Sequence, residues 1–144
     1  MRISTKGRYG IAVMLSLAER LGQQQTAVDI AKKLGISKIY LEQVLSLLKN
    51  AGLVQSIKGS QGGYLLDTTA ENITVLEILK ATEAGLFERA ETSSEESAAY
   101  IEKAIQNTVW DPLDKTVNSL LSNITLQAVL DNSRTLGSGY MFYI

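Results

Sequence analysis

Two neighbouring side chains, Glu42 and Gln43, carry hydrogen-bonding groups of the kind that distinguish one base pair from another. A carboxylate accepts a hydrogen bond from N4 of cytosine, and a carboxamide pairs with adenine through two hydrogen bonds. Lys38, Tyr40 and Lys49 flank this pair, with cationic and hydroxyl groups suited to phosphates. Any solvated helix face carries similar residues, so the elements around the pair must decide between the two interpretations.

The segment "SKIYLEQVLSLLKNAG" predicts a helix that carries Glu42 and Gln43. Ser37 is a residue type that caps a first turn. A turn of about 100° per residue places four apolar side chains on one stripe and leaves Glu42 and Gln43 on the opposite side. The stripe consists of Leu41, Val44, Leu45 and Leu48.

A shorter helix is expected just before this one, in "TAVDIAKKLGIS". Thr26 and Asp29 have the spacing of a capping box, and Gly35 can end the helix in a tight turn. Two helices around such a turn form a helix-turn-helix. A scaffold helix that stops near Gly22 is expected to precede them. Its apolar stripe consists of Ile11, Met14, Leu15, Ala18 and Leu21.

A β-hairpin is predicted directly after the helix-turn-helix. Two short β-type runs, Leu53 to Ile57 and Tyr64 to Leu66, are joined by a loop with three glycines. A hairpin in this position is a wing, with Lys58 at its shoulder and Gly59 at its flexible tip. Both could approach a nucleic-acid backbone, although a glycine-rich tip is more often only a turn.

The charge of the chain is divided unequally between its two parts. Residues 1–66 hold nine basic and three acidic residues, a net charge of +6. Residues 67–144 hold five basic and twelve acidic residues, a net charge of -7. Such asymmetry is typical of a protein in which one half binds a polyanion and the other half does not.

The composition excludes most enzymatic chemistry. The chain has no cysteine and no histidine, so thiolate metal sites, iron–sulfur ligation by cysteine and imidazole catalysis are not available. We expect neither a catalytic residue, nor a metal site, nor a cofactor. No apolar run is long enough to span a membrane, and a cytoplasmic location is expected.

The acidic part contains a long apolar stripe that starts at Ile101 and passes through Pro112 without changing phase. It predicts one long helix over about 97–122, bent at the proline; a break at Asp111, with Pro112 opening a new helix, is the alternative. The stripe is too long for a small domain to cover, so packing across a two-fold axis is expected, against the alternative that it lies on its own domain. The expected dimer contacts are Val109, Trp110, Leu113, Val117, Leu120, Leu121 and Ile124.

Three segments, "STKGRYG", "YLEQVLSLLKNAGLVQSIKGSQGGYLL" and "NITLQAVL", together resemble the Rrf-two family of bacterial winged-helix transcription regulators. The resemblance implies a homodimer on palindromic double-stranded DNA, with the YLEQ helix in the major groove and the wing in the minor groove. Lys58 replaces an arginine that is common in the family, and an ammonium cannot make the same forked contact. The candidate DNA-binding residues are Arg8, Ser37, Lys38, Tyr40, Glu42, Gln43, Lys49, Lys58 and Gly59.

Members of the family that hold an iron–sulfur cluster carry three cysteines between the wing domain and the long helix. The corresponding segment here, "EAGLFERAETSSEESAAYIEK", has none, so the chain resembles the clusterless branch. The likeness is greatest to repressors of cysteine metabolism in that branch. It implies control through a complex with cysteine synthase (O-acetylserine thiol-lyase).

The chain ends in "GSGYMFYI", an apolar tail after an expected Gly-Ser-Gly hinge. The tail either packs on its own protein or enters the synthase, which captures partner peptides that end in isoleucine. The candidate partner-binding residues are Phe142, Tyr143 and Ile144.

The expected fold is mainly α with a small β-hairpin: a winged helix-turn-helix domain plus a long dimerisation helix. We expect the DNA-binding domain at 1–66, a short helix and acidic linker at 67–97, the dimerisation helix and a following short helix at 98–136, and the apolar tail at 137–144. The expected function is a repressor of sulfur and cysteine metabolism genes. The alternative is a protein-interaction module that regulates cysteine synthase through its tail, with little specific DNA reading.

Overall fold

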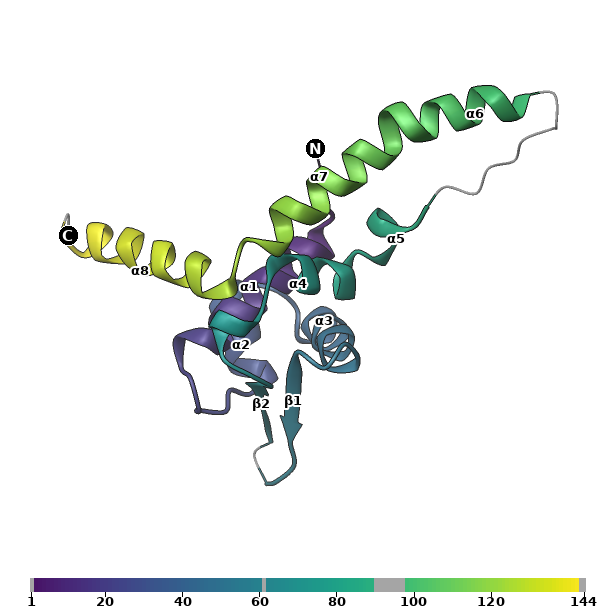
Figure 1. Cartoon of the computed structure of the whole chain (residues 1–144). Helices are drawn as coiled ribbons and strands as arrows, with labels where there is room; N and C mark the ends of the chain where they lie inside the picture. The colour runs from purple at the N-terminus through teal and green to yellow at the C-terminus, as the bar shows by residue number, and fades with distance from the viewer. Residues whose placement is uncertain (1, 61, 90–97, 143–144) are drawn as a thin grey trace.

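The computed structural model describes residues 2–60, 62–89 and 98–142, with the backbone alone for residues 139–142. A body of helices with a small hairpin carries two projecting elements (Figure 1). A long helical run leaves the body on one side, and the last helix leaves it on the other. The predicted fold class, mainly α with one antiparallel hairpin, is confirmed.

Three helices form the predicted helix-turn-helix and its scaffold: α1 (Thr5–Glu19), α2 (Ala27–Leu34) and α3 (Lys38–Asn50). The Thr26 hydroxyl accepts a hydrogen bond from the Asp29 N–H, and the Ser37 hydroxyl accepts one from the Tyr40 N–H, so both predicted N-caps are present. Gly35 ends α2 at φ 67°, a left-handed conformation that glycine adopts without a steric cost.

The wing consists of β1 (Val54–Ile57) and β2 (Gly63–Leu66), paired antiparallel with Val54 opposite Leu66 and Ile57 opposite Gly63. The turn η1 (Ala70–Asn72) and the helices α4 (Val75–Thr82) and α5 (Ala84–Phe87) follow. The region expected to hold a short helix and an acidic linker thus contains α4, which is part of the body because Ile73, Ile78 and Leu79 are buried.

One hydrophobic core joins the helix-turn-helix, the wing, α4 and the start of the last helix. The predicted stripe of α3 is fully buried in it, as are Met14 and Ile30. The prediction that Leu21 belongs to the apolar stripe of the first helix is wrong. Leu21 lies beyond the end of α1, which stops at Glu19, and its side chain is 64% exposed.

Two glycines of the "STKGRYG" segment allow α1 to approach α4 closely. A Cβ atom on Gly10 would lie 2.8 Å from Cγ2 of Thr82, and one on Gly7 would lie 2.7 Å from Cγ of Glu83. The Oε1 atom of Glu83 accepts a hydrogen bond of 2.6 Å from the Ser4 N–H, which ties the start of α1 to the end of α4. These glycines are therefore packing residues.

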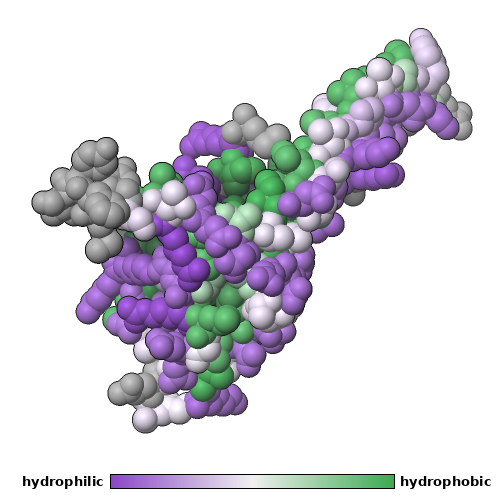
Figure 2. Space-filling view, turned by 60° about the vertical axis from the view of Figure 1, so that its left-hand side comes forward, coloured by the Kyte–Doolittle hydropathy of each residue, from purple (hydrophilic) through white to green (hydrophobic). Residues whose placement is uncertain are grey.

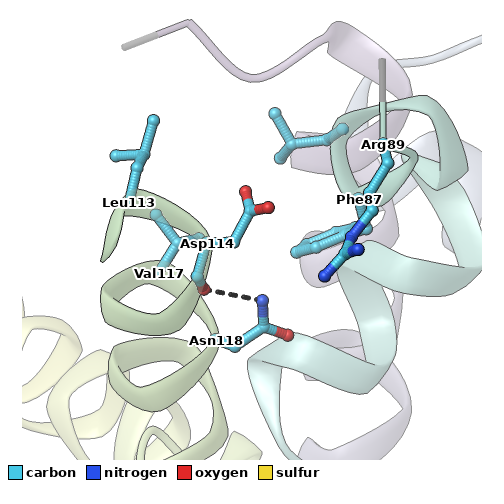
Figure 3. Close-up of a pocket in the computed structure, with 7 residues that line it drawn as sticks. Phe87, Arg89, Leu113, Asp114, Val117 and Asn118 are labelled. Carbon is cyan, nitrogen blue, oxygen red and sulfur yellow. Dashed lines mark hydrogen bonds between the residues drawn. The ribbon is translucent and has the colours of Figure 1, made fainter. Parts of the chain in front are cut away.

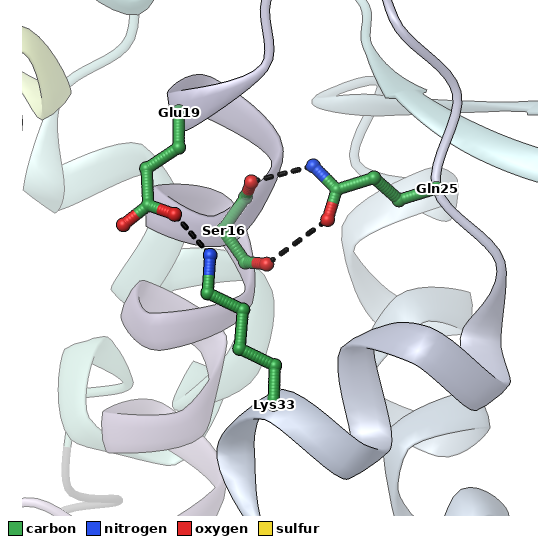
Figure 4. A network of polar contacts seen from close by, with 4 residues as sticks. All are labelled: Ser16, Glu19, Gln25 and Lys33. Atoms are coloured by element: carbon green, nitrogen blue, oxygen red, sulfur yellow. Dashed lines mark hydrogen bonds and ion pairs between the residues drawn. The ribbon is translucent and has the colours of Figure 1, made fainter.

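A buried polar network around Gln25 connects α1 to the wing (Figure 4). The Gln25 Nε2 atom donates to the Ser16 carbonyl over 2.6 Å, and the Ser16 hydroxyl donates back to Gln25 Oε1 over 3.2 Å. The Gln25 backbone exchanges hydrogen bonds with Tyr64 of β2. Lys33 and Glu19 form an ion pair beside this network. The amide of Gln25 is thus satisfied although the residue is buried.

The long helical run consists of α6 (Ala99–Ile105), the π-helical turn η3 (Gln106–Trp110) and α7 (Asp111–Ser122). We call these residues, 99–122, the arm. Asp111 has helical backbone angles, so the helix continues across it and the alternative of a break is wrong. The Asp111 N–H donates to the Gln106 carbonyl five residues earlier, as in a π-turn, directly before Pro112.

The last helix, α8, spans Leu126–Phe142. Its start is fixed to the body, since Leu126 and Leu130 are buried and the Leu126 N–H donates to the Ile73 carbonyl over 2.8 Å. The expectation of a Gly-Ser-Gly hinge is wrong, because residues 137–139 are helical and the boundary at 136/137 falls inside α8. Tyr143 and Ile144 lie outside the described residues, and Phe142 is described by its backbone alone.

Candidate DNA-binding surface

Four exposed side chains of α3 form one face of the helix, at spacings of three and four residues. They are Ile39, Glu42, Gln43 and Ser46, and we call them the reading face. Together with Lys6 and Leu47 they line a hollow between α3 and the start of α1. The fold thus brings a cation from another helix beside the two predicted base readers.

A second hollow lies between the start of α2, the side of α3 and the wing. Its lining includes Thr26, the N-cap of α2, and Val28 of α2, together with Lys38 and Glu42 of α3 and Tyr64 of the wing. Glu42 therefore borders both hollows. The three elements of a winged helix-turn-helix converge around this one carboxylate.

Glu42 has a cation beside it. The Lys38 Nζ atom lies 3.7 Å from Glu42 Oε1, one helical turn away, and both side chains are exposed. An exposed pair of this kind contributes about 0–1 kcal/mol, so it separates easily when another group approaches. Lys38 offsets the charge of Glu42 and thereby lowers the repulsion that a carboxylate would meet near phosphates.

Ser37 and Tyr40 have structural roles at the start of α3. The Ser37 hydroxyl caps the helix and still has its own proton to donate. The Tyr40 ring is half-buried and lies edge-on to the Tyr9 ring, with centroids 5.7 Å apart. This contact holds α3 against α1, and the expected DNA contacts of both residues stay predictions.

The remaining expected DNA contacts are more scattered. Lys58 and Gly59 follow β1 directly and are exposed at the wing. Lys49 is exposed in the last turn of α3 but lines neither hollow. Arg8 lies elsewhere, in a hollow with Arg2, Ser4 and Glu83.

Lys6 is a candidate contact that the sequence analysis missed. Lys6 and Arg8 are two residues apart on α1, so their side chains point to nearly opposite sides, and Lys6 is the one beside the reading face. Its membership in the "STKGRYG" segment was a usable signal. The choice between Lys6 and Arg8 required the packing of α1 on α3.

The expected dimer residues lie on the arm, except for Ile124, which follows it. Val109, Trp110, Leu113 and Leu120 are large apolar side chains between 46% and 61% exposed, and Val117, Leu121 and Ile124 are half-buried. Hydrophobic side chains follow one side of the arm and hydrophilic ones the other (Figure 2). No residue of α6, η3 or α7 is buried in the described chain.

A hollow separates the arm from α5 (Figure 3). It is lined by Leu113 and Val117 of α7 on one side and by Phe87 and Arg89 on the other. The Asn118 amide beside it donates to the Asp114 carbonyl over 2.8 Å. Of the acidic segment before the arm, residues 90–97 lie outside the described residues.

Within the described ranges, no helix is both long and apolar enough to cross a membrane. The polar groups of the reading face are instead arranged around the two hollows beside α3.

Residues 3–132 match the family described as "Rrf2: Iron-dependent Transcriptional regulator". The chain is 37% identical over its whole length, and over the whole relative, to the HTH-type transcriptional regulator CymR of Bacillus subtilis. It is 35% identical to the HTH-type transcriptional regulator IscR of Pectobacterium atrosepticum, covering 94% of this chain and 83% of that protein. A solved structure of CymR, described as the global cysteine regulator of B. subtilis, superposes with a TM-score of 0.73 at 34% identity, covering 92% of this chain and 98% of that one.

The family description names iron, but the residues of this chain do not fit an iron site of thiolate or imidazole ligands. The sequence has no cysteine and no histidine. Among the described residues, no group of three or more carboxylates could hold a metal ion either.

The relatives are named as transcriptional regulators of the HTH type, in agreement with the prediction of a regulator that is not an enzyme. The helix-turn-helix, the wing and the exposed reading face agree with this assignment. The family match covers most of the chain, and a full-length relative exceeds 30% identity. The chain therefore belongs to the Rrf2 family of transcriptional regulators.

Proposed function

We propose that this regulator binds a palindromic operator as a homodimer and represses genes of sulfur and cysteine metabolism, without an iron–sulfur cluster. The observation that carries the proposal is the reading face of α3. It exposes Glu42, Gln43 and Ser46 in a hollow bordered by Lys6, and Glu42 also borders the hollow beside the wing. Base-reading groups with cations around them are the arrangement that a major groove requires.

The distribution of charge also supports DNA binding by the reading face. Lys6, Lys49 and Lys58 make no ion pair within the described residues, so they are free to contact phosphates. In the described part of the chain, Lys38 is paired with Glu42 alone. The part of the chain before residue 67 has a net charge of +6, and the arm lies in the acidic part. We infer that the body faces the DNA and the arm lies away from it.

The homodimer is supported by the apolar side of the arm. Tyr100 is 74% exposed and Leu120 is 61% exposed, with Trp110 between them at 47%. Hydrophobic side chains gather along one side of the arm (Figure 2), and no described residue of α6, η3 or α7 is fully buried. A contiguous exposed apolar surface of this kind marks an interface. A second copy is the natural partner, since a two-fold protein reads two half-sites about 10 base pairs, or a multiple, apart.

The link to cysteine metabolism rests on likeness. A relative of the same length, 37% identical throughout, is CymR, and the solved CymR structure is described as that of a global cysteine regulator. The absence of cysteine and histidine from the sequence supports regulation without a cluster.

Cysteine synthase is the proposed protein partner, through Phe142, Tyr143 and Ile144. The second half of α8 runs away from the body (Figure 1), and residues 134–138 are exposed. The end of the chain would therefore be carried outward on a helix, where an enzyme could reach it. Deletion of Ile144 is expected to abolish capture of the full chain by purified cysteine synthase and to leave operator affinity unchanged.

The DNA-binding proposal is tested by selecting preferred duplexes from a randomised pool with the full chain and measuring their affinity at several salt concentrations. We expect a palindromic preference and an affinity that falls steeply with salt, because phosphate contacts release counterions. Gln43→Ala is expected to reduce discrimination at one position per half-site by about 1–3 kcal/mol. Lys58→Ala is expected to weaken all sequences alike and to lower the salt slope by about one.

Lys103→Ala, in the arm, is the matched control for Lys58→Ala, because it removes the same charge from an exposed position away from the reading face. It is expected to leave DNA binding unchanged. An affinity that does not respond to salt, or an equal affinity for scrambled duplex, would contradict the proposal and favour the interaction module.

A further inference from the structure

An exposed isoleucine stands among the polar groups of the reading face. Ile39 is 73% exposed, although it is the second residue of a helix whose other side is fully buried. It lines the same hollow as Glu42, Gln43 and Lys6. A β-branched apolar side chain in water contributes nothing to the core. We therefore look for a binding partner that would cover it.

The position of Ile39 on α3 indicates what kind of partner could cover its side chain. Ile39 lies one turn before Glu42 and Gln43, on the same face and nearer to the start of α3. In a helix-turn-helix, residues near the start of the recognition helix reach the base edges. Ile39 is therefore nearer to the part of the helix that enters the groove than either predicted base reader.

The chemistry of the major groove offers one apolar feature, the C5-methyl group of thymine. Cytosine presents an amino donor in the same groove, and the purines present acceptors or an amino group. The γ and δ carbons of Ile39 cannot form hydrogen bonds with any of these groups. Burial against a methyl group is the one favourable contact that the side chain can make there.

We propose that Ile39 packs on the C5-methyl group of a thymine and sets a specificity position of the operator. This inference rests on the proposed DNA binding and deepens it. Ile39 selects thymine by apolar contact, while Glu42 and Gln43 read neighbouring bases by hydrogen bonds. The operator thus carries, in each half-site, a thymine next to the bases that these two residues read.

The test uses the selected duplex and replaces its thymines by deoxyuridine one at a time, which removes the methyl group and leaves the base pairing intact. At one thymine per half-site, the full chain is expected to bind about fourfold more weakly, the effect of losing the burial of one methyl-sized group. Ile39→Ala is expected to bind the thymine and uracil duplexes equally. The effects of the two changes are then non-additive, as for groups in contact.

Leu21→Ala is the matched control, because Leu21 is a comparably exposed apolar residue, at 64%, that lines neither hollow beside α3. It is expected to keep the fourfold preference. If Ile39→Ala keeps that preference, or if no thymine of the selected duplex responds to loss of its methyl group, Ile39 does not read thymine and another partner covers it. Failure of the full chain to select any sequence would overturn the DNA-binding proposal itself, which distinguishes the two failures.

Discussion

The body and the arm differ in how far their apolar side chains are buried. The body encloses a core in which the whole stripe of α3 is inaccessible to solvent, together with residues of α1, α2, α4, the wing and α8. The arm has an equally regular stripe, and none of it is buried. The same periodicity therefore produces a core in one region and an exposed stripe, the proposed interface, in the other, and the difference lies in what packs against it.

The two regions also differ in their charged residues. The exposed side of α3 carries its cations next to hydrogen-bonding groups, whereas the arm carries three acidic and two basic residues, a net charge of -1. The arm therefore offers phosphates little net attraction, and its apolar side attracts another apolar surface. We therefore expect substitutions in the two regions to affect different measured properties.

The largest expected effect comes from placing a charge on the apolar side of the arm. Val109→Asp is expected to convert the proposed dimer into a monomer and to weaken operator binding by about 10²- to 10⁴-fold, because the second half-site loses its tethered partner. Light scattering coupled to size exclusion measures the first result, and operator titration measures the second.

Asn107→Asp is the control for this change. It introduces the same side chain at an exposed position two residues away, on the opposite side of the helix. It is expected to leave the protein dimeric. A Val109→Asp protein that remains dimeric with full affinity would show that the stripe of the arm is not the interface.

An intermediate effect is expected from the core side of α3. Leu45 is fully buried, so Leu45→Ala removes apolar contacts and leaves a cavity, at a cost of about 2–5 kcal/mol in the free energy of unfolding. Ile39→Ala, on the exposed side of the same helix, is expected to change that free energy by less than about 0.5 kcal/mol. Urea unfolding of the two variants makes the comparison, and equal losses would contradict the assigned orientation of α3.

The smallest effect concerns two helical glycines with different surroundings. Gly10→Ala places a Cβ atom 2.8 Å from Cγ2 of buried Thr82, and the resulting strain is expected to lower stability by about 1 kcal/mol after the gain in helix propensity. Gly137→Ala in α8 meets no atom within 4 Å and is expected to stabilise α8 by about 0.5–1 kcal/mol.

Thermal unfolding of the two alanine variants measures this pair. A stabilising Gly10→Ala would mean that α1 and α4 are less closely packed than described. A destabilising Gly137→Ala would mean that residues 137–139 are not helical and that a hinge is present after all.

Local signals in the sequence predicted much of the body. The hydroxyl caps at Thr26 and Ser37, the left-handed Gly35 and the buried stripe of α3 depend only on neighbours within a turn or two. The wing was predicted to within one residue at each strand, since its β-type runs are bounded by glycines. Features fixed by short-range geometry are readable without a tertiary structure.

The errors and omissions involve contacts between distant segments. Lys6 joins the reading face only because α1 packs on α3, which also directs Arg8 elsewhere. The packing roles of Gly7 and Gly10 are visible only when Glu83 and Thr82 are placed beside them. The two glycines at 137 and 139 suggested a hinge by composition, but α8 continues through both.

The π-turn before Pro112 has a consequence for the direction of the apolar stripe. Ile101, Ile105, Val109, Leu113, Val117 and Leu121 follow one another at intervals of four residues. In an ideal α-helix, four residues advance by about 400°, so a row spaced in this way drifts around the helix by about 40° at each step. The turn Gln106–Trp110 holds more residues than an α-turn, and it reverses part of that drift midway along the row. The wider turn thus keeps the apolar row nearer to one side of the arm than an uninterrupted α-helix would, and if the same residues formed plain α-turns, the half of the row after Pro112 would turn further away from the half before it.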